Sequence, residues 1–267
     1  GSEMCIRDRP YTTSASFWER IDSMINGKKM LVVSAHAADY VWRAGGTIAK
    51  YIKHGAEVHL VVLSFGGRGE SNDLWKQPGA TAESVKAVRR AETEAAADIL
   101  GIKNIEFWDL QDYPIVTDDA LTDRLVGKIR LVRPDIILTH DRMGADVLNP
   151  DHNHVSQWVF QCSILANSAG VRTEGLSNTT QMRLYGFEPH QTELSKFVPG
   201  SFVDITETYE QKVAAMKCFK AQSHLIQYYT DRAFLRGNHA RRISGNQSCK
   251  YAECFSNFFP VVGDELY

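Results

Sequence analysis

Short apolar runs alternate with longer amphipathic segments along most of the chain. Runs rich in aliphatic and β-branched residues, which predict strands, lie at 29–35, 57–64, 104–109, 135–140 and 182–188. Segments with helical periodicity lie near 44–54, 82–100, 119–132 and 207–222. The first three helices are predicted to end at the helix-stopping residues His54-Gly55, Gly101 and Pro134.

The strand-like runs are almost continuously apolar, as in Lys29-Met30-Leu31-Val32-Val33. Strands of this kind are buried on both faces, and their alternation with helices predicts an α/β fold with a mostly parallel, doubly wound sheet. In such sheets, ligands bind beyond the carboxyl ends of the strands. We therefore expect the active site at the C-terminal edge of the strands.

Polar clusters follow four of the predicted strands, where this edge lies. In chain order they are His36 with Asp39, the loop Gly66 to Ser71, the segment Asp109 to Tyr113, and the segment His140 to His152. Because the carboxyl ends of parallel strands meet at one edge, these clusters are expected to converge in space.

Composition and charge narrow the class of protein. With 267 residues, 43% of them hydrophobic, the chain is long enough for one large domain, which we assign to residues 17–267. Residues 1–16 lack periodicity, begin with a Gly-Ser pair typical of a cleaved tag, and are expected to be a disordered leader. A balance of 30 basic against 32 acidic residues argues against a nucleic-acid partner, and the lack of an apolar stretch near ~20 residues argues against a membrane. Five cysteines without a C-x-x-C pair fit reduced thiols in a cytoplasmic protein.

Three residues of the polar clusters form a candidate metal site, namely His36, Asp39 and His152. Two imidazoles and one carboxylate leave coordination positions open for water and substrate, as a catalytic zinc ion requires. Asp151 is expected either to orient the His152 ring or to cap the helix that starts there. The histidines expected to have ordinary structural or surface roles are His54, His59, His140 and His154.

The loop Gly66-Gly67-Arg68-Gly69-Glu70 combines glycines with two charged side chains, but it has neither Walker nor dinucleotide-binding spacing. Arg68 suits a substrate carboxylate, and Glu70 is a candidate acid or base. The alternative is a flexible surface loop with a salt bridge. His190 is either a proton-transfer partner or an ordinary loop histidine, and Arg43 is a second candidate for a substrate carboxylate.

At these residues the chain resembles the PIG-L/LmbE family of zinc-dependent N-acetylglucosamine deacetylases, which have a Rossmann-like three-layer fold. Ala35-His36-Ala37-Ala38-Asp39 is similar to the family motif A-H-P-D-D, and Asn149-Pro150-Asp151-His152 is similar to H-P-D-H. The resemblance implies that the first histidine, the last aspartate and the final histidine of these motifs bind zinc. Two positions depart from the family. Ala38 stands where deacetylases have their general base, and Asn149 stands where they have a histidine that stabilises the oxyanion.

The chain resembles more closely a hydratase branch of this family, the 4-oxalomesaconate (4-carboxy-2-hydroxymuconate) hydratases of gallate and protocatechuate breakdown. The similar stretches are 38–46, 63–71 and 187–190. The resemblance implies a zinc-dependent lyase, as a homo-oligomer, that adds water to a conjugated double bond of a small tricarboxylate. Glu70 and His190 would share the proton transfers. Arg68, Arg43 and Asn149 would bind the substrate.

Two other functions stay open from the sequence. One is a zinc-dependent N-acyl deacetylase or amidohydrolase of the N-acetylglucosamine type, either inactivated at Ala38 or provided with a substitute base. The other is a non-enzymatic binding module derived from a deacetylase. Decay would erode the metal ligands as readily as the base, whereas all three ligand positions are intact.

Overall fold

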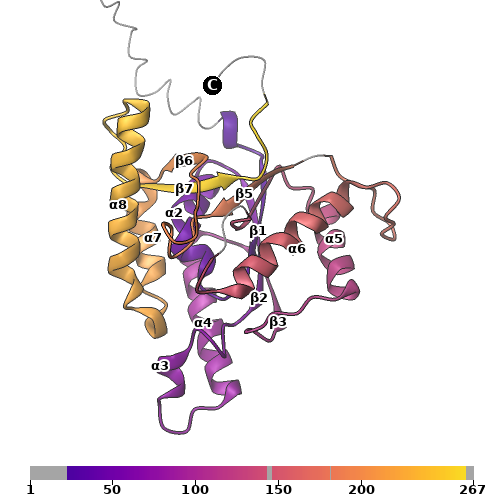
Figure 1. The fold of residues 1–267 in the computed structure, drawn as a ribbon, viewed down its shortest axis with the longest axis horizontal. Helices are drawn as coiled ribbons and strands as arrows, with labels where there is room; N and C mark the ends of the chain where they lie inside the picture. The colour runs from indigo at the N-terminus through magenta and orange to yellow at the C-terminus, as the bar shows by residue number, and fades with distance from the viewer. Residues whose placement is uncertain (1–22, 143–145, 181, 263–267) are drawn as a thin grey trace, which may run out of the picture.

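The computed structural model describes residues 23–142, 146–180 and 182–262, and the predicted leader at residues 1–16 lies outside them. Seven strands form one sheet in the order β3-β2-β1-β4-β5-β7-β6 (Figure 1). The strands are β1 (Lys29–Ser34), β2 (Glu57–Ser64), β3 (Asn104–Leu110), β4 (Ile136–His140), β5 (Arg183–Phe187), β6 (Ser201–Asp204) and β7 (Ala252–Asn257). Neighbours from β3 to β5 are parallel, whereas β7 pairs antiparallel with both β5 and β6. The predicted α/β fold with a mostly parallel sheet is confirmed.

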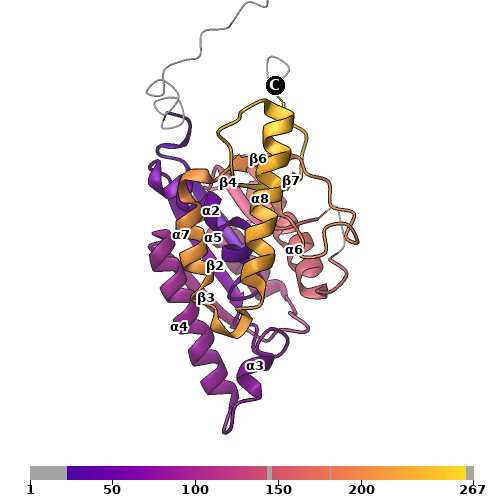
Figure 2. The same cartoon turned by 90° about the vertical axis from the view of Figure 1, so that its left-hand side faces the viewer.

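Helices cover both faces of the sheet because alternate side chains of each strand point to opposite sides (Figures 1 and 2). Met30 and Val32 of β1 pack in one core cluster, whereas Leu31 and Val33 pack in another. The helices over the first cluster are α2 (Asp39–Lys53), α4 (Ala82–Leu100), α7 (Tyr209–Met216) and α8 (Leu225–Ser244), and those over the second are α5 (Asp119–Val132) and α6 (Pro150–Asn167). Among the helices of the described ranges, none is long and apolar enough to cross a bilayer.

The helices α4 and α5 have their predicted bounds, but two other predictions need correction. The first helix begins at Asp39 rather than near residue 44, because the Asp39 carboxylate turns back to accept the backbone N–H of His36 at 2.8 Å. The predicted helix 207–222 ends at Met216, and only a short 3-10 turn follows it at η2 (Lys220–Gln222). There Glu92 of α4 accepts the backbone N–H of Lys220 at 2.9 Å, which takes the place of an intrahelical bond.

A buried ion pair between α7 and β7 also binds the backbone in the middle of α2. Glu253 accepts the backbone N–H groups of Gly46 and Thr47 at 3.0 and 2.7 Å, and it pairs with Lys212 of α7 at 2.6 Å. We expect Glu253→Ala to lower the free energy of unfolding by about 3–5 kcal/mol, because it leaves the Lys212 ammonium buried without its partner. Urea denaturation measures this change. The exposed ion pair of Glu94 provides the control, since Glu94→Ala should cost less than about 1 kcal/mol. Equal effects of the two substitutions would contradict the prediction.

Candidate metal centre and active site

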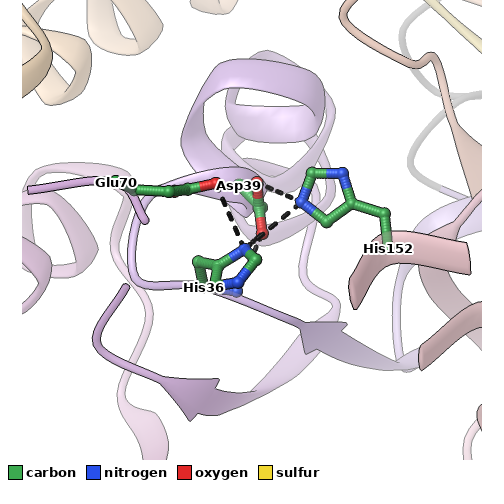
Figure 3. A group of neighbouring side chains, drawn as sticks. All are labelled: His36, Asp39, Glu70 and His152. Carbon is green, nitrogen blue, oxygen red and sulfur yellow. Dashed lines mark hydrogen bonds and ion pairs between the residues drawn. The ribbon is translucent and has the colours of Figure 1, made fainter. Parts of the chain in front are cut away.

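Four side chains meet at the carboxyl edge of the sheet, where β1 lies between β2 and β4. Chain connections diverge to opposite sides of β1 here, and doubly wound sheets form a ligand-binding crevice at such a point. His36 follows β1, Asp39 begins α2, Glu70 lies in the loop after β2, and His152 lies in the first turn of α6 (Figure 3). The structure therefore brings the three predicted metal ligands together with the predicted acid-base residue.

The spacing of these side chains suits one small cation. Their ligand-type atoms all lie within 4.8 Å of one another. Nδ1 of His36 is 3.3 Å from an Asp39 carboxylate oxygen, 3.3 Å from Nε2 of His152 and 3.2 Å from Oε1 of Glu70. Nitrogen and oxygen ligands about 2.1 Å from a tetrahedral zinc ion lie roughly 3.4 Å apart. The arrangement therefore matches the separation of ligands around such an ion.

A carboxylate holds the far nitrogen of each candidate ligand histidine. Oδ2 of Asp151 lies 3.0 Å from Nε2 of His36, and Oδ2 of Asp146 lies 2.9 Å from Nδ1 of His152. The prediction that Asp151 orients His152 or caps its helix is therefore wrong. Asp151 lies on the side of the first turn of α6 that faces His36, whereas the loop before the helix returns Asp146 to His152.

These hydrogen bonds decide which ring atoms present lone pairs. In the neutral rings, Nε2–H of His36 donates to Asp151 and the far nitrogen of His152 donates to Asp146, so both inner nitrogens present lone pairs to the cluster. Two lone pairs and two carboxylates then converge, an arrangement that favours a cation. Burial lowers the pKa of His36, but the charge of Glu70 and the hydrogen bonds to Asp151 and Asp39 outweigh burial and raise this pKa well above its usual value. The carboxylates that favour a positive charge on His36 equally favour a cation bound at its inner nitrogen, so the residues fit a divalent metal ion.

Arg43 contacts this cluster directly. It lies one turn after Asp39 on α2 and donates to the Asp39 carboxylate, and its guanidinium is 3.8 Å from Asp146. Burial raises the pKa of the Asp39 carboxyl, but the charges of His152 and Arg43 outweigh burial and hold it well below its usual value. Asp39 is therefore fixed as a carboxylate, which is the form that binds a metal.

A cavity of about 170 Å³ opens onto the cluster. Of the residues predicted to act on substrate, Arg43, Glu70, Asn149 and His190 line it. Arg68 is exposed and is not among the described residues that line the cavity, because the loop turns its side chain outward while its backbone N–H bonds to a carboxylate. The other lining residues are Asp39, Trp42, Tyr113, Asp146, Leu148, His152, Gln222, Leu225 and Tyr229.

Asn149, the residue before α6, is buried against Glu70. Its Nδ2 donates to Oε1 of Glu70 at 3.1 Å, which fixes the orientation of that carboxylate. Its Oδ1 is buried and has no hydrogen-bond partner among the described residues. A buried acceptor without a partner costs about 1–3 kcal/mol, so a hydroxyl group or water in the cavity would be bound favourably there.

Two kinds of constraint set the conformation of the glycine-rich loop, namely positions that favour glycine and hydrogen bonds to one carboxylate. Asp112 accepts the backbone N–H groups of Arg68 and Gly69 at 2.8 to 3.0 Å. Gly66 has a φ of +67°, and a Cβ atom at Gly69 would overlap the ring of Tyr113. The Tyr113 ring in turn stacks on His36, with centroids 5.6 Å apart. The loop that presents Glu70 is therefore built to pack tightly against the candidate metal centre.

His190 lines the cavity and follows β5, which lies on the other side of β1 from β2 in the sheet. Its Nδ1 lies 3.4 Å from the hydroxyl group of Tyr229, and its ring stacks on Tyr228 with centroids 4.4 Å apart. Burial, assisted by the charges of Arg43 and Arg232, lowers the pKa of His190 to about 4. The imidazole is therefore neutral at physiological pH, so it can accept a proton at one ring nitrogen and donate a hydrogen bond from the other.

This charge state gives a direct prediction. The His190 ring should titrate near pH 4, below the usual 6.5, so it should stay neutral as the pH falls from 8 to about 5. Ring signals in NMR spectra of histidine-labelled protein measure this titration, and His190→Gln assigns the signal that disappears. A His190 signal that titrates near 6.5 or above would contradict the prediction.

His140 was expected to have an ordinary structural or surface role, yet it lies beside the candidate metal centre. Its ring stacks on His152 with centroids 3.9 Å apart, and its Nε2 accepts the backbone N–H of Ala35 at 3.1 Å. Burial and the charge of His152 lower the pKa of His140 well below its usual value. His140 is therefore neutral and buried, and it packs against the candidate ligand His152. Its role is structural, as expected, but it lies next to the candidate metal centre.

The sequence did not indicate several residues of the site. Asp146 is one of them, although a ligand histidine commonly donates its far N–H group to a carboxylate. Tyr113 and Tyr229 were also missed as lining residues, and only Tyr113 carried a signal, because it follows a strand at the carboxyl edge. Tyr229 lies on α8, which does not directly follow a strand, so the strand-end rule does not point to it.

Comparison with known proteins places this fold and site in a family. Residues 31–163 match the PIG-L family, described as GlcNAc-PI de-N-acetylase. A 4-oxalmesaconate hydratase of Pseudomonas putida is 41% identical over 90% of this chain and 92% of its own length. The chain therefore belongs to the PIG-L family.

Solved structures agree with this assignment. The crystal structure of GalB, the 4-carboxy-2-hydroxymuconate hydratase from Pseudomonas putida KT2440, has a TM-score of 0.85 at 40% identity and covers 90% of this chain and 100% of its own. A diacetylchitobiose deacetylase of Thermococcus kodakarensis is 29% identical over 73% of this chain and 70% of its own length. The N,N'-diacetylchitobiose deacetylase from Pyrococcus horikoshii shares the fold, with a TM-score of 0.73 at 21% identity over 94% of each chain.

Proposed function

We propose that the protein is a metal-dependent hydratase, a hydro-lyase that adds water to a conjugated double bond of 4-oxalomesaconate or 4-carboxy-2-hydroxymuconate in aromatic catabolism. The observation that carries the proposal is the 41% identity to a 4-oxalmesaconate hydratase across 90% of the chain. Gallate and protocatechuate are the aromatic compounds whose breakdown would supply this substrate.

The site supports this function because it lacks the base of a deacetylase and has a different carboxylate in its place. Ala38 is fully buried and has no group that accepts a proton. Glu70 instead reaches the cluster from the loop after β2, with Oε1 3.2 Å from Nδ1 of His36. A carboxylate there is placed to take a proton from a water molecule beside the metal ligands.

We assign His36, Asp39 and His152 as ligands of a zinc ion, a metal that two imidazoles and one carboxylate suit. When bound, zinc would supply a Lewis acid that polarises the keto or enol oxygen of the substrate. Glu70 would take a proton from the attacking water and later release it to solvent, while His190, neutral at rest, would take up a proton and pass it to the substrate carbon, so that the elements of one water molecule are added.

The remaining predicted residues would bind the tricarboxylate. Arg43 presents a buried guanidinium to the cavity, and Asn149 presents an acceptor without a partner among the described residues. Arg68 would meet a substrate carboxylate only at the exposed loop, outside the lining of the cavity. A cytoplasmic location and a homo-oligomeric assembly complete the proposal.

A deacetylase acting on N-acetylglucosamine-type amides is the second candidate, favoured by the 29% identity to a diacetylchitobiose deacetylase. It would need a base other than residue 38. Release of acetate from N-acetylated sugars, with no hydration of the dienoic acid, would establish this function instead. A protein that holds metal but does neither would be a binding module.

The experiment that tests the proposal is an absorbance assay. Zinc-loaded protein is incubated with 4-carboxy-2-hydroxymuconate, and loss of the conjugated-diene absorbance is followed beside a sample treated with EDTA. We expect rapid loss that depends on the metal. No loss in the metal-loaded sample would contradict the hydratase.

A further inference from the structure

One face of α8 holds the backbone on both sides of His190. Nη1 of Arg232 donates to the carbonyl oxygen of Pro189 at 2.6 Å, and Nη2 donates to that of His190 at 2.7 Å. The hydroxyl group of Tyr228 also donates to the His190 carbonyl. Residues 228 and 232 are one helical turn apart and therefore lie on the same face of α8. The planar guanidinium thus clamps two successive peptide groups.

The same helix also locates the imidazole ring. Tyr228 stacks on the His190 ring, and the hydroxyl group of Tyr229 lies 3.4 Å from its Nδ1. Of these residues, His190 and Tyr229 line the cavity, whereas Arg232 lies behind them with its side chain 13% exposed. Arg232 therefore acts on the cavity through His190 and not through direct contact.

The ion pair of Arg232 with Glu188 does not account for the orientation of the Arg232 guanidinium. Glu188, two residues before His190, is bound by Arg236 through both of its carboxylate oxygens, with Nε at 3.0 and 3.1 Å. Arg232 is 3.7 Å from the same carboxylate, and its hydrogen bonds go to the two carbonyl oxygens instead. Hydrogen bonds from a charged donor are stronger than those between neutral groups, so the two bonds strongly restrict the loop.

We propose that Arg232 is a positioning residue of the active site, which holds the His190 peptide so that the imidazole stays within reach of a substrate in the cavity. The proposal rests on the role of His190 in the proposed hydration. The electrostatics agree with the geometry, because the Arg232 charge is one of the causes that lower the pKa of His190. The other titratable groups around this ring are Arg43, Asp146, His224, Tyr228 and Tyr229.

The test compares Arg232→Ala and Arg232→Lys with Arg242→Ala, a change at an exposed residue of the same helix. Steady-state hydration kinetics and NMR titration of the His190 ring are measured on metal-loaded protein. We expect Arg232→Ala to lower kcat by about 10- to 100-fold with a smaller change in KM, because small misplacements of a reacting group cost this much. The pKa of His190 should rise from about 4 towards 6.5. Arg242→Ala should leave both readouts unchanged.

The variant Arg232→Lys keeps the positive charge but loses the planar guanidinium, so it separates the effect of charge from that of hydrogen-bond geometry. Its single ammonium group cannot reproduce the planar fork on two carbonyls, so the kcat of Arg232→Lys should lie within a few-fold of the kcat of Arg232→Ala. This variant also serves if Arg232→Ala does not fold. Wild-type kcat in both variants, or a lower kcat of Arg232→Ala with unchanged His190 ring signals, would overturn the proposal. If the wild-type protein does not hydrate the dienoic acid, the proposed function fails, and the ring signals still decide whether Arg232 positions His190.

Discussion

Glu70→Gln is expected to lower hydratase turnover by about 10²–10⁴-fold while the protein keeps its metal. Glutamine preserves the size of the side chain, and its Oε1 can still accept from Nδ2 of Asn149, which lies 3.1 Å from the Glu70 carboxylate in this structure. An amide cannot take the proton of the attacking water, so the loss should fall on kcat. Stopped-flow absorbance measures turnover, and elemental analysis measures bound metal.

Glu94→Gln is the matched control, since Glu94 is an exposed glutamate on α4 and should leave kcat unchanged. Near-normal turnover of Glu70→Gln would show that the role assigned to Glu70 is wrong. Loss of the metal together with turnover would also contradict it, because Glu70 would then act mainly as a ligand.

His152→Ala is expected to abolish both metal binding and turnover. The substitution removes one of two inner imidazole nitrogens, which lie 3.3 Å apart in the cluster. Lewis-acid catalysis is worth several kcal/mol, so kcat should fall by at least about 10³-fold. In the wild-type protein, zinc at 100 times its Kd should raise the free energy of unfolding by about 2.7 kcal/mol, and this gain should vanish in the variant. Metal content and thermal unfolding with and without zinc measure these effects.

Asp146→Ala provides a graded comparison. Asp146 orients His152 through its far nitrogen at 2.9 Å but is not itself assigned as a ligand. Its loss should weaken metal affinity by about 10- to 100-fold, with activity restored at higher zinc concentration. Full zinc affinity in His152→Ala would exclude His152 as a ligand.

The sequence predicted the parallel part of the sheet and the convergence of the polar clusters because both follow from strand order. His36, Glu70 and His152 are 116 residues apart at the extremes, yet each follows a strand whose carboxyl end lies at the same edge. This inference needs only the order of the strands and does not require a sequence motif that links the distant residues. The rule places residues at the edge, and their identities then suggest the chemistry.

The direction of individual side chains depends on tertiary packing, which the hydrophobic periodicity of the sequence does not predict. Arg68 shares a loop with Glu70, but hydrogen bonds from the loop backbone to Asp112 turn its side chain towards solvent. The contact of Asp151 depends on how α6 enters the site after the chain leaves β4. Spacing along the sequence therefore does not determine which imidazole it meets.

Of the long helices, α8 is not predicted from the sequence, and α6 is predicted only by its start near Asn149-Pro150-Asp151. α6 opens with the polar turn Pro150-Asp151-His152-Asn153-His154, which masks its apolar face. α8 lacks a clean apolar stripe, since Phe234, Leu235 and Ile243 are exposed by 52%, 47% and 73%. The residues of α8 around His190 could therefore be recognised only from the structure.

The central claim, a metal-dependent hydratase, is tested most directly by the mass of the reaction product. Zinc-loaded protein is given 4-carboxy-2-hydroxymuconate, and the product is analysed by mass spectrometry beside an EDTA-treated sample. A product heavier than the substrate by one water molecule, formed only with metal, is the predicted result. Unchanged dienoic acid, together with acetate released from N-acetylated sugars, would contradict the hydratase and assign the site to amide hydrolysis.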